Sequence, residues 1–302
     1  MTSESPSVHQ ASVEGDSVHP LTEQRRLIWD GMRLSRRFFL NHQMFLVRFD
    51  AVQARRDECR QRGLPAPSFS ACVMHAIGQV LPQHPWLNAY LTPFPRRIVR
   101  YRNVDICYTV ECRNADGAPY VGFSCLRNAA ALSLDEISAQ LTATRTACDS
   151  GSKAAQHPYT GLPTVLRWLH YTFRCAPFPT KAREIFGTVG FSSVGKWGAM
   201  ITTPLAPRSL TFSLGTVDRQ PVVDGDIVRP GLAAWLTLTY DHRIADGAQV
   251  ARLGAEIADF LARFPIGPTP ALAIPAPAAV SPEAKSPRGV PSGLNSFPAT
   301  SG

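Results

Sequence analysis

The stretch that decides the fold is Leu236-Thr-Leu-Thr-Tyr-Asp-His-Arg-Ile-Ala-Asp-Gly-Ala248, in the C-terminal part of the chain. Apolar and polar residues alternate from Leu236 to Tyr240, which predicts a strand with one buried face. Beyond Gly247 the apolar residues are spaced for one face of a helix; they are Val250, Leu253, Ile257, Phe260, Leu261 and Phe264. The turn between strand and helix holds Asp241, His242, Arg243 and Asp246. We expect His242 to be a reactive group there.

The composition indicates a globular protein, because 44% of the 302 residues are hydrophobic and 18% are charged. The formal net charge of +8 comes almost wholly from arginine, since lysine occurs at only four positions. An arginine-rich surface suits nucleic acid, an acidic carrier protein or phosphate-bearing ligands. No basic run is interleaved with aromatic residues, so we expect no nucleic-acid partner.

Seven cysteines occur, without a Cys-x-x-Cys pair or zinc-ligand spacing, so we expect no metal and reduced, largely buried thiols. Residues 1–19 lack the apolar core of a secretory signal, and no apolar run is long enough to span a bilayer. These features predict a cytoplasmic protein without a membrane partner.

The chain is expected to contain one ordered domain of the α+β class, residues 20–264. Residues 1–19 are polar and residues 265–302 are rich in Pro, Ala and Ser, so both are predicted to be disordered. Helices are expected over 23–36, 50–62, 71–81, 133–148 and 162–185. Strands are expected over 44–49, 104–110, 120–126, 187–194 and 209–217, with a hairpin over 104–126.

Weaker candidates have ordinary structural interpretations. His157 and His170 are interpreted as solvated or packed residues, and His75 as a core residue of an apolar helix. Cys125 has no neighbour in the sequence that would lower the pKa of its thiol. Even the His242 and Asp246 pair, taken alone, fits a surface loop with a helix-capping aspartate.

Asp-His-Arg-x-x-Asp-Gly, running from Asp241 to Gly247, resembles the catalytic-domain signature of the dihydrolipoyl acyltransferases of 2-oxoacid dehydrogenase complexes. It also resembles the wider chloramphenicol acetyltransferase-like superfamily, whose His-x-x-x-Asp-Gly motif recurs in peptide-synthetase condensation domains. Three further stretches are similar to that family: Pro20-Leu-Thr-Glu-Gln-Arg25-Arg-Leu-Ile, Gly187-Thr-Val-Gly-Phe-Ser-Ser-Val-Gly195 and Val217-Asp-Arg-Gln-Pro-Val-Val-Asp-Gly.

This resemblance implies a two-layer α/β sandwich, with a mixed sheet and helices on one face, that forms a homotrimer with active sites between subunits. It implies that His242 is the general base and that Ser192 stabilises the oxyanion. Asp246 would be structural or orienting and would pair with Arg25, for which Arg26 is the adjacent competitor. From the residues alone, Ser192 also fits a strand-end serine bonded to its own backbone, and Arg25 a solvated helix face.

The implied activity is acyl transfer from a CoA, lipoyl or phosphopantetheine thioester, with no tightly bound cofactor. The sequence departs from the family in showing no lipoyl or subunit-binding domain and in the aromatic stretch 161–186. We therefore expect a stand-alone enzyme that meets a lipoyl-domain or acyl-carrier protein in trans. Two alternatives stay open: an acylation or condensation enzyme of specialised metabolism that acts on a small molecule or a carrier-bound chain, and a non-catalytic oligomeric scaffold.

Overall fold

The computed structural model describes residues 21–113, 117, 119–149 and 162–265. The predicted disordered segment 1–19, nearly all of the predicted tail 265–302, and His157 lie outside these residues.

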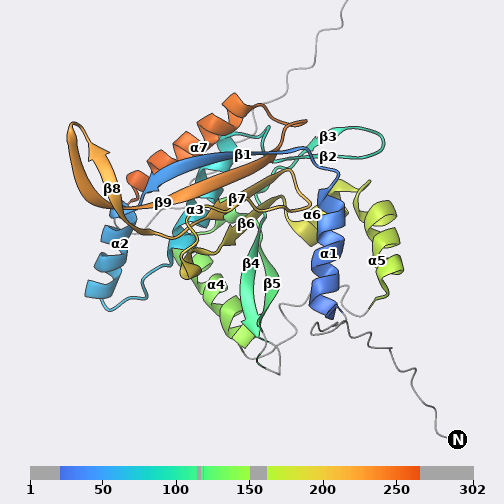
Figure 1. The fold of residues 1–302 in the computed structure, drawn as a ribbon, viewed down its shortest axis with the longest axis horizontal. Helices are drawn as coiled ribbons and strands as arrows, with labels where there is room; N and C mark the ends of the chain where they lie inside the picture. The colour runs from blue at the N-terminus through green and yellow to red at the C-terminus, as the bar shows by residue number, and fades with distance from the viewer. Residues whose placement is uncertain (1–20, 114–116, 118, 150–161, 266–302) are drawn as a thin grey trace, which may run out of the picture. The chain divides into compact units, whose positions relative to one another are not determined.

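Among the described residues, seven strands form one mixed sheet in the order β1-β9-β7-β6-β4-β5, with β8 paired to β9 (Figure 1). β4, β6 and β7 are parallel neighbours, and the other pairs are antiparallel. The strands are β1 (Leu40–Arg48), β4 (Ile106–Arg113), β5 (Pro119–Leu126), β6 (Val189–Ser193), β7 (Leu210–Leu214), β8 (Asp218–Asp224) and β9 (Ile227–Asp241). A separate hairpin joins β2 (Ala89–Leu91) and β3 (Ile98–Arg100). The predicted α+β class and the predicted 104–126 hairpin are confirmed.

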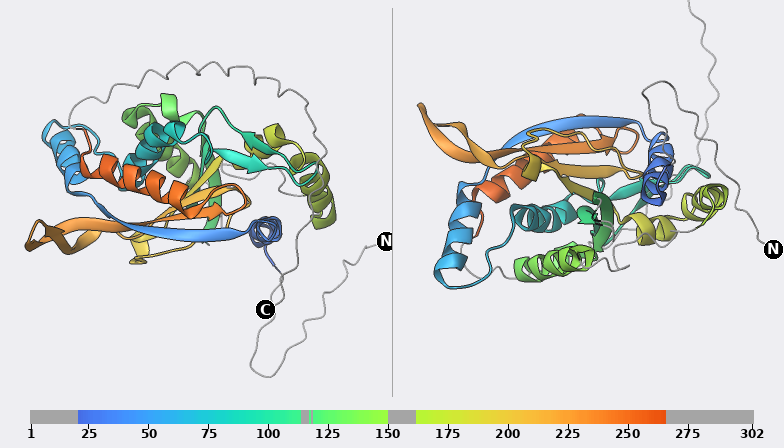
Figure 2. Two further views of the ribbon diagram at one scale, coloured as in Figure 1. Left: turned by 90° about the horizontal axis from the view of Figure 1, so that it is seen from above. Right: turned by 60° about the horizontal axis from the view of Figure 1, so that its bottom comes forward.

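The helices are α1 (Glu23–Ser35), α2 (Asp50–Gln61), α3 (Phe69–Val80), α4 (Leu134–Asp149), α5 (Thr164–His170), α6 (Pro179–Phe186) and α7 (Gly247–Ala262). Short helical turns lie at Leu81–Gln83, Ala129–Ala131, Tyr171–Cys175 and Gly195–Trp197. Helices α3, α4 and α7 lie on one side of the sheet, as expected (Figure 2). Ser68 is the N-cap of α3, because its Oγ accepts from the Ala71 N–H at 3.1 Å.

The two faces of the central strands differ in chemistry because side chains alternate along a strand. One face is apolar and packs on the helices; Phe212 of β7 and Leu238 of β9 are paired there and fully buried. The opposite face carries hydroxyl groups, with Ser192 beside Ser213 and Ser213 beside Thr237 across β6, β7 and β9. The sheet therefore presents Ser192 away from the apolar core.

The stretch predicted as one interrupted helix, 162–185, forms α5, a π-helical turn and α6. Arg167 of α5 forms a buried ion pair with Asp30 of α1, with Nε 2.7 Å from Oδ2. A charge removed from water needs such a partner, so this pair fixes α5 against α1. Trp168 and Phe173 of this stretch are exposed, so neither belongs to the core.

The expectation that all cysteines are reduced is wrong. Cys112 of β4 and Cys148 of α4 form a disulfide, and both residues are fully buried. Their proximity arises from the packing of α4 on the sheet, which no local spacing of cysteines reveals. The other five cysteines are free, and burial raises the pKa of the Cys125 thiol to about 12, which fits an unreactive group.

Within the described residues, no helix combines the length and the apolarity needed to span a membrane.

Candidate active site

The turn after β9 is held by a buried carboxylate. Asp241 is fully buried and accepts hydrogen bonds from Arg243 at three donors: Nε at 2.9 Å, Nη2 at 2.5 Å and the backbone N–H at 3.1 Å. A buried carboxylate requires such pairing, and these charge-assisted hydrogen bonds are strong. Asp241 and Arg243 therefore fix the backbone on either side of His242.

His242 is exposed on this turn. Its backbone N–H donates to the Phe39 carbonyl at 2.9 Å, just before β1, while its side chain is 48% exposed. Nδ1 lies 3.9 Å from Oδ1 of Asp246, too long for a hydrogen bond but close enough for electrostatic stabilisation of a protonated ring. The imidazole is thus anchored through its backbone and faces a carboxylate, with the ring open to an incoming group.

Asp246 begins helix α7. It is the N-cap residue in extended conformation, and its backbone N–H donates to Oε1 of Gln249 at 3.1 Å. Arg25 lies exposed in the first turn of α1, and the ion pairs among the described residues do not include one between Arg25 and Asp246. The pair implied by the family resemblance is therefore not formed within this chain, because Asp246 is placed by its cap and faces His242.

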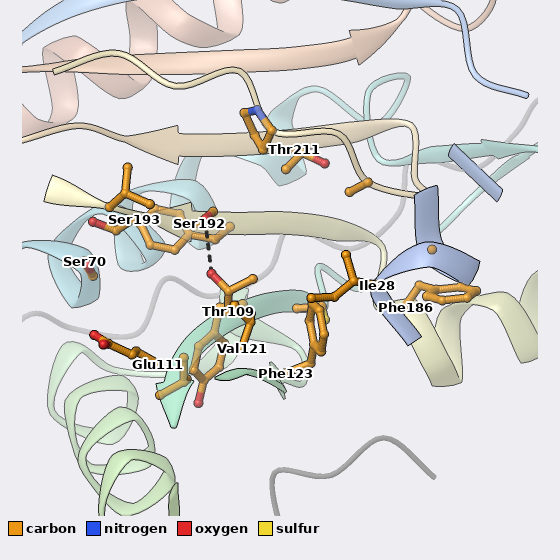
Figure 3. A pocket seen from close by; sticks show the side chains of 18 of the residues that line it. Ile28, Ser70, Thr109, Glu111, Val121, Phe123, Phe186, Ser192, Ser193 and Thr211 are labelled. Carbon is orange, nitrogen blue, oxygen red and sulfur yellow. Dashed lines mark hydrogen bonds between the residues drawn. The ribbon is translucent and has the colours of Figure 1, made fainter. Parts of the chain in front are cut away.

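Ser192 lines a large cavity that we call the Ser192 cavity, with a volume of about 880 Å³. Its walls come from α1, α3, β4, β5, α4, α6, β6, β7 and the segment between β6 and β7. Oγ of Ser192 accepts a hydrogen bond from Oγ1 of Thr109 at 3.1 Å (Figure 3). Ser192 thus accepts from Thr109 with one of its own lone pairs rather than bonding its own backbone, and its hydroxyl proton stays available to an oxygen in the cavity.

The walls of the Ser192 cavity differ on the two sides of Ser192. Figure 3 shows Ile28, Phe123 and Phe186 on one side of the Thr109–Ser192 bond, and the polar residues Ser70, Ser193 and Glu111 on the other. The cavity therefore offers apolar surface and hydrogen-bonding groups to a ligand held next to Ser192.

His242 and Ser192 do not meet within one chain. Ser192 pairs with Ser213, which pairs with Thr237, and His242 lies five residues further along, about 16 Å at about 3.3 Å per residue. His242 is not among the residues that line the Ser192 cavity. A base and an oxyanion donor must each lie within about 3 Å of the reacting groups. One chain thus presents the two groups to different spaces.

The sequence did not point to Thr109. It belongs to a predicted strand, but its contact with Ser192 depends on the parallel pairing of β4 with β6, two strands that are far apart in the sequence. The alternation of apolar and polar residues along β4 indicates only on which face of the sheet Thr109 lies.

Comparison with known proteins supports the motif-based recognition. Residues 185–266 match the family model for the catalytic domain of the 2-oxoacid dehydrogenases acyltransferase. The chain is 38% identical over 73 residues to the dihydrolipoyllysine-residue acetyltransferase component of the pyruvate dehydrogenase complex of Azotobacter vinelandii, covering 24% of this chain and 11% of that protein. It is 32% identical over 75 residues to the mitochondrial dihydrolipoyllysine-residue succinyltransferase component of 2-oxoglutarate dehydrogenase complex 1 of Arabidopsis thaliana, covering 24% and 16%.

Solved structures extend the similarity to the whole fold. The cubic core of the pyruvate dehydrogenase multienzyme complex matches with a TM-score of 0.64 and 20% identity, over 85% of this chain and 97% of that chain. A dihydrolipoamide acetyltransferase of Azotobacter vinelandii matches with a TM-score of 0.64 and 21% identity, over 85% and 97%. In fold and in the sequence of residues 185–266, the chain is similar to the catalytic domains of the 2-oxoacid dehydrogenase acyltransferases.

Proposed function

We propose that the chain is an acyltransferase whose site combines His242 of one copy with the Ser192 cavity of another. The observation that carries this proposal is the placement of His242, exposed on a turn that buried Asp241 fixes, within the segment that matches the acyltransferase family. The matched segment spans less than a fifth of the length of the two curated relatives described above, so the activity rests on the site and not on the relatives' names.

In the proposed reaction, the neutral imidazole of His242 removes the proton from an acceptor thiol, hydroxyl or amine. The acceptor atom attacks the thioester carbonyl carbon, and the carbonyl oxygen becomes an oxyanion that accepts a hydrogen bond from the Ser192 hydroxyl. The intermediate then expels the donor thiolate, which takes the proton back from the imidazolium. Asp246, 3.9 Å from Nδ1, stabilises the imidazolium between these steps.

A solved relative supports the residue assignment. The Azotobacter vinelandii structure was used to study the role of a serine, a histidine and an asparagine in that enzyme's mechanism, and the asparagine follows the histidine by four positions. Asp246 follows His242 by the same interval here. We propose that Ser192, His242 and Asp246 are the corresponding groups, with a carboxylate in place of the amide.

The separation of Ser192 from His242 supports an oligomeric site. The sheet register keeps the two groups apart in one chain, and a second copy supplies the missing partner in a symmetric assembly. We propose a homotrimer, in which every chain gives its His242 to one neighbour and its Ser192 cavity to the other.

The acyl donor is proposed to be a thioester of CoA, of a lipoyl group or of a carrier-protein phosphopantetheine, delivered in trans. Acylation of a small molecule or carrier-bound chain in specialised metabolism is a second candidate. It is favoured by the aromatic stretch around α5 and α6, because Tyr171, Ile185 and Phe186 from that stretch line the Ser192 cavity.

The test is transfer by the full chain from acyl-CoAs to dihydrolipoamide, read by mass spectrometry and repeated with small amine and hydroxyl acceptors. Transfer that His242→Ala abolishes and His84→Ala retains supports the proposal; His84 is a matched control because it pairs with Glu256 at 2.8 Å, outside the site. Transfer to the lipoyl acceptor alone favours the first candidate, and transfer to small acceptors alone favours the second. If no acceptor is acylated, the result favours the third alternative, a non-catalytic oligomeric scaffold.

A further inference from the structure

A buried arginine without an acceptor lines the Ser192 cavity. Arg208 is only 9% exposed, and among the described residues its guanidinium has no ion pair or hydrogen bond. Nε in particular is buried and unpartnered. Removing an isolated charge from water is costly, so a buried guanidinium is normally paired with an anion. No described residue supplies that anion to Arg208.

The guanidinium occupies space that Gly190 leaves free. A Cβ on Gly190 would lie 2.7 Å from Nη1 of Arg208 and 2.9 Å from Oγ1 of Thr211. Gly190 is paired with Thr211 and lies two residues before Ser192, so all three positions share one face of the sheet. The guanidinium therefore lies about 7 Å along β6 from Ser192, at about 3.3 Å per residue.

The acidic side chains of the cavity leave Arg208 unpaired. Glu111 pairs with Lys196 at 3.4 Å, and neither Glu111 nor Asp149, the two acidic residues that line the cavity, forms an ion pair with Arg208. The Thr211 hydroxyl beside it has no hydrogen bond to another described residue. The Arg208 guanidinium and the Thr211 hydroxyl thus lie together over Gly190, two residues from Ser192, and neither is bonded to another described side chain.

We propose that Arg208, assisted by Thr211, is a subsite for a carboxylate at the far end of the acyl group, so that the enzyme selects short dicarboxylic acyl thioesters. This proposal rests on the proposed function. With the thioester carbonyl at Ser192 and hydrogen bonds of about 2.8 Å at both ends, a short chain spans the distance to Arg208. A guanidinium matches a carboxylate in two parallel hydrogen bonds.

The position of Arg208 favours an acyl carboxylate over a phosphate of the donor. In CoA and phosphopantetheine the phosphates are separated from the thioester sulfur by the whole pantetheine arm. Arg208 lies only two strand positions from Ser192, on the same face, where the acyl carbonyl is proposed to bind.

The test compares succinyl-CoA with butyryl-CoA, which have acyl chains of equal length that differ in the terminal carboxylate. We expect the wild type to prefer succinyl-CoA. Arg208→Met should lower kcat/KM for succinyl-CoA by about 10- to 100-fold and leave butyryl-CoA nearly unchanged, because a charged hydrogen-bonding partner is lost. Arg208→Lys should retain part of the preference. Arg145→Met, an exposed arginine on the cavity wall, is the matched control and should retain it all.

Equal use of both thioesters by the wild type overturns the proposal. An equal loss with both in Arg208→Met also overturns it, because it indicates contact with the common CoA part. The proposal is also overturned if Arg208→Met changes the oligomeric state but keeps the preference for succinyl-CoA over butyryl-CoA. That result would indicate that Arg208 binds an acidic group of a neighbouring copy.

If no thioester is transferred, the proposed function fails, and the melting temperature then tests the subsite. A rise with succinate but not butyrate that Arg208→Lys retains and Arg208→Met abolishes supports a carboxylate subsite. No rise overturns it.

Discussion

The surroundings of Ser192 and of His242 are opposites. Ser192 lies on a central strand, in a cavity of about 880 Å³, with its hydroxyl bonded to Thr109. His242 lies on an exposed turn at the end of β9, with 48% of its side chain exposed. The backbone fixes the position of both residues: Ser192 belongs to β6 of the central sheet, and His242 follows the buried Asp241. Each residue is thus held in a defined place by its own surroundings, as the proposed site shared between copies requires.

Of the changes at Ser192 and His242, removal of the His242 imidazole is expected to have the largest effect on kcat. His242→Ala should lower kcat by about 10²- to 10⁴-fold, the usual contribution of a positioned base. The melting temperature should be nearly unchanged, because the side chain is exposed. Steady-state kinetics and thermal melting check both statements. A loss of activity that follows a loss of folded protein would contradict them.

The loss of the Ser192 hydroxyl should cost somewhat less. Ser192→Ala should lower kcat by about 10²- to 10³-fold, as when one oxyanion donor is removed. Ser193→Ala is the matched control: Ser193 follows Ser192 in β6 and also lines the cavity, but it is not the serine bonded to Thr109, and a much smaller loss is expected. Equal losses in the two variants would remove Ser192 from the mechanism.

The pH dependence of stability should depend on a different histidine, His75. It is 1% exposed among Phe260 and Phe264, and burial lowers its pKa to about 4. Below pH 6.5 the unfolded chain therefore binds a proton that the folded chain does not. As the pH is lowered from about 6.5 to about 4, the free energy of unfolding therefore decreases. The expected loss is about 2 kcal/mol at pH 5.

Urea unfolding at pH 7 and pH 5 measures this loss. His75→Leu should abolish most of it, whereas His242→Ala should leave it unchanged. The reverse result would assign the titration to the exposed histidine.

The smallest expected effect comes from Thr109. Thr109→Val keeps the side-chain shape but removes the hydrogen bond to Ser192, so kcat should fall by about fivefold, equivalent to about 1 kcal/mol. Thr109→Ser should recover most of the rate. A rate for Thr109→Val equal to that of the wild type would show that Ser192 needs no such support.

Local features were predictable from the sequence. The Ser68 cap, the β4–β5 hairpin and the strand-to-helix turn around His242 each depend on residues close together in the chain. Alternation and capping residues signal such features directly.

The features that the sequence did not reveal depend on long-range packing. The Thr109–Ser192 bond needs parallel pairing of β4 with β6, and the burial of Arg208 depends on the empty space above Gly190. The Cys112–Cys148 disulfide likewise needs α4 to pack on the sheet. His242 was predicted from the charged strand-to-helix turn and Ser192 through the family resemblance, whereas their separation within one chain follows from the sheet register.

The most direct test of the shared site mixes two defective chains. His242→Ala and Ser192→Ala carry different affinity tags, are produced together, and oligomers that contain both are purified through both tags. In a trimer of this kind, one of the three sites combines an intact His242 with an intact Ser192, so about one third of the wild-type rate is predicted. Activity no higher than that of the separate variants would contradict a site shared between copies.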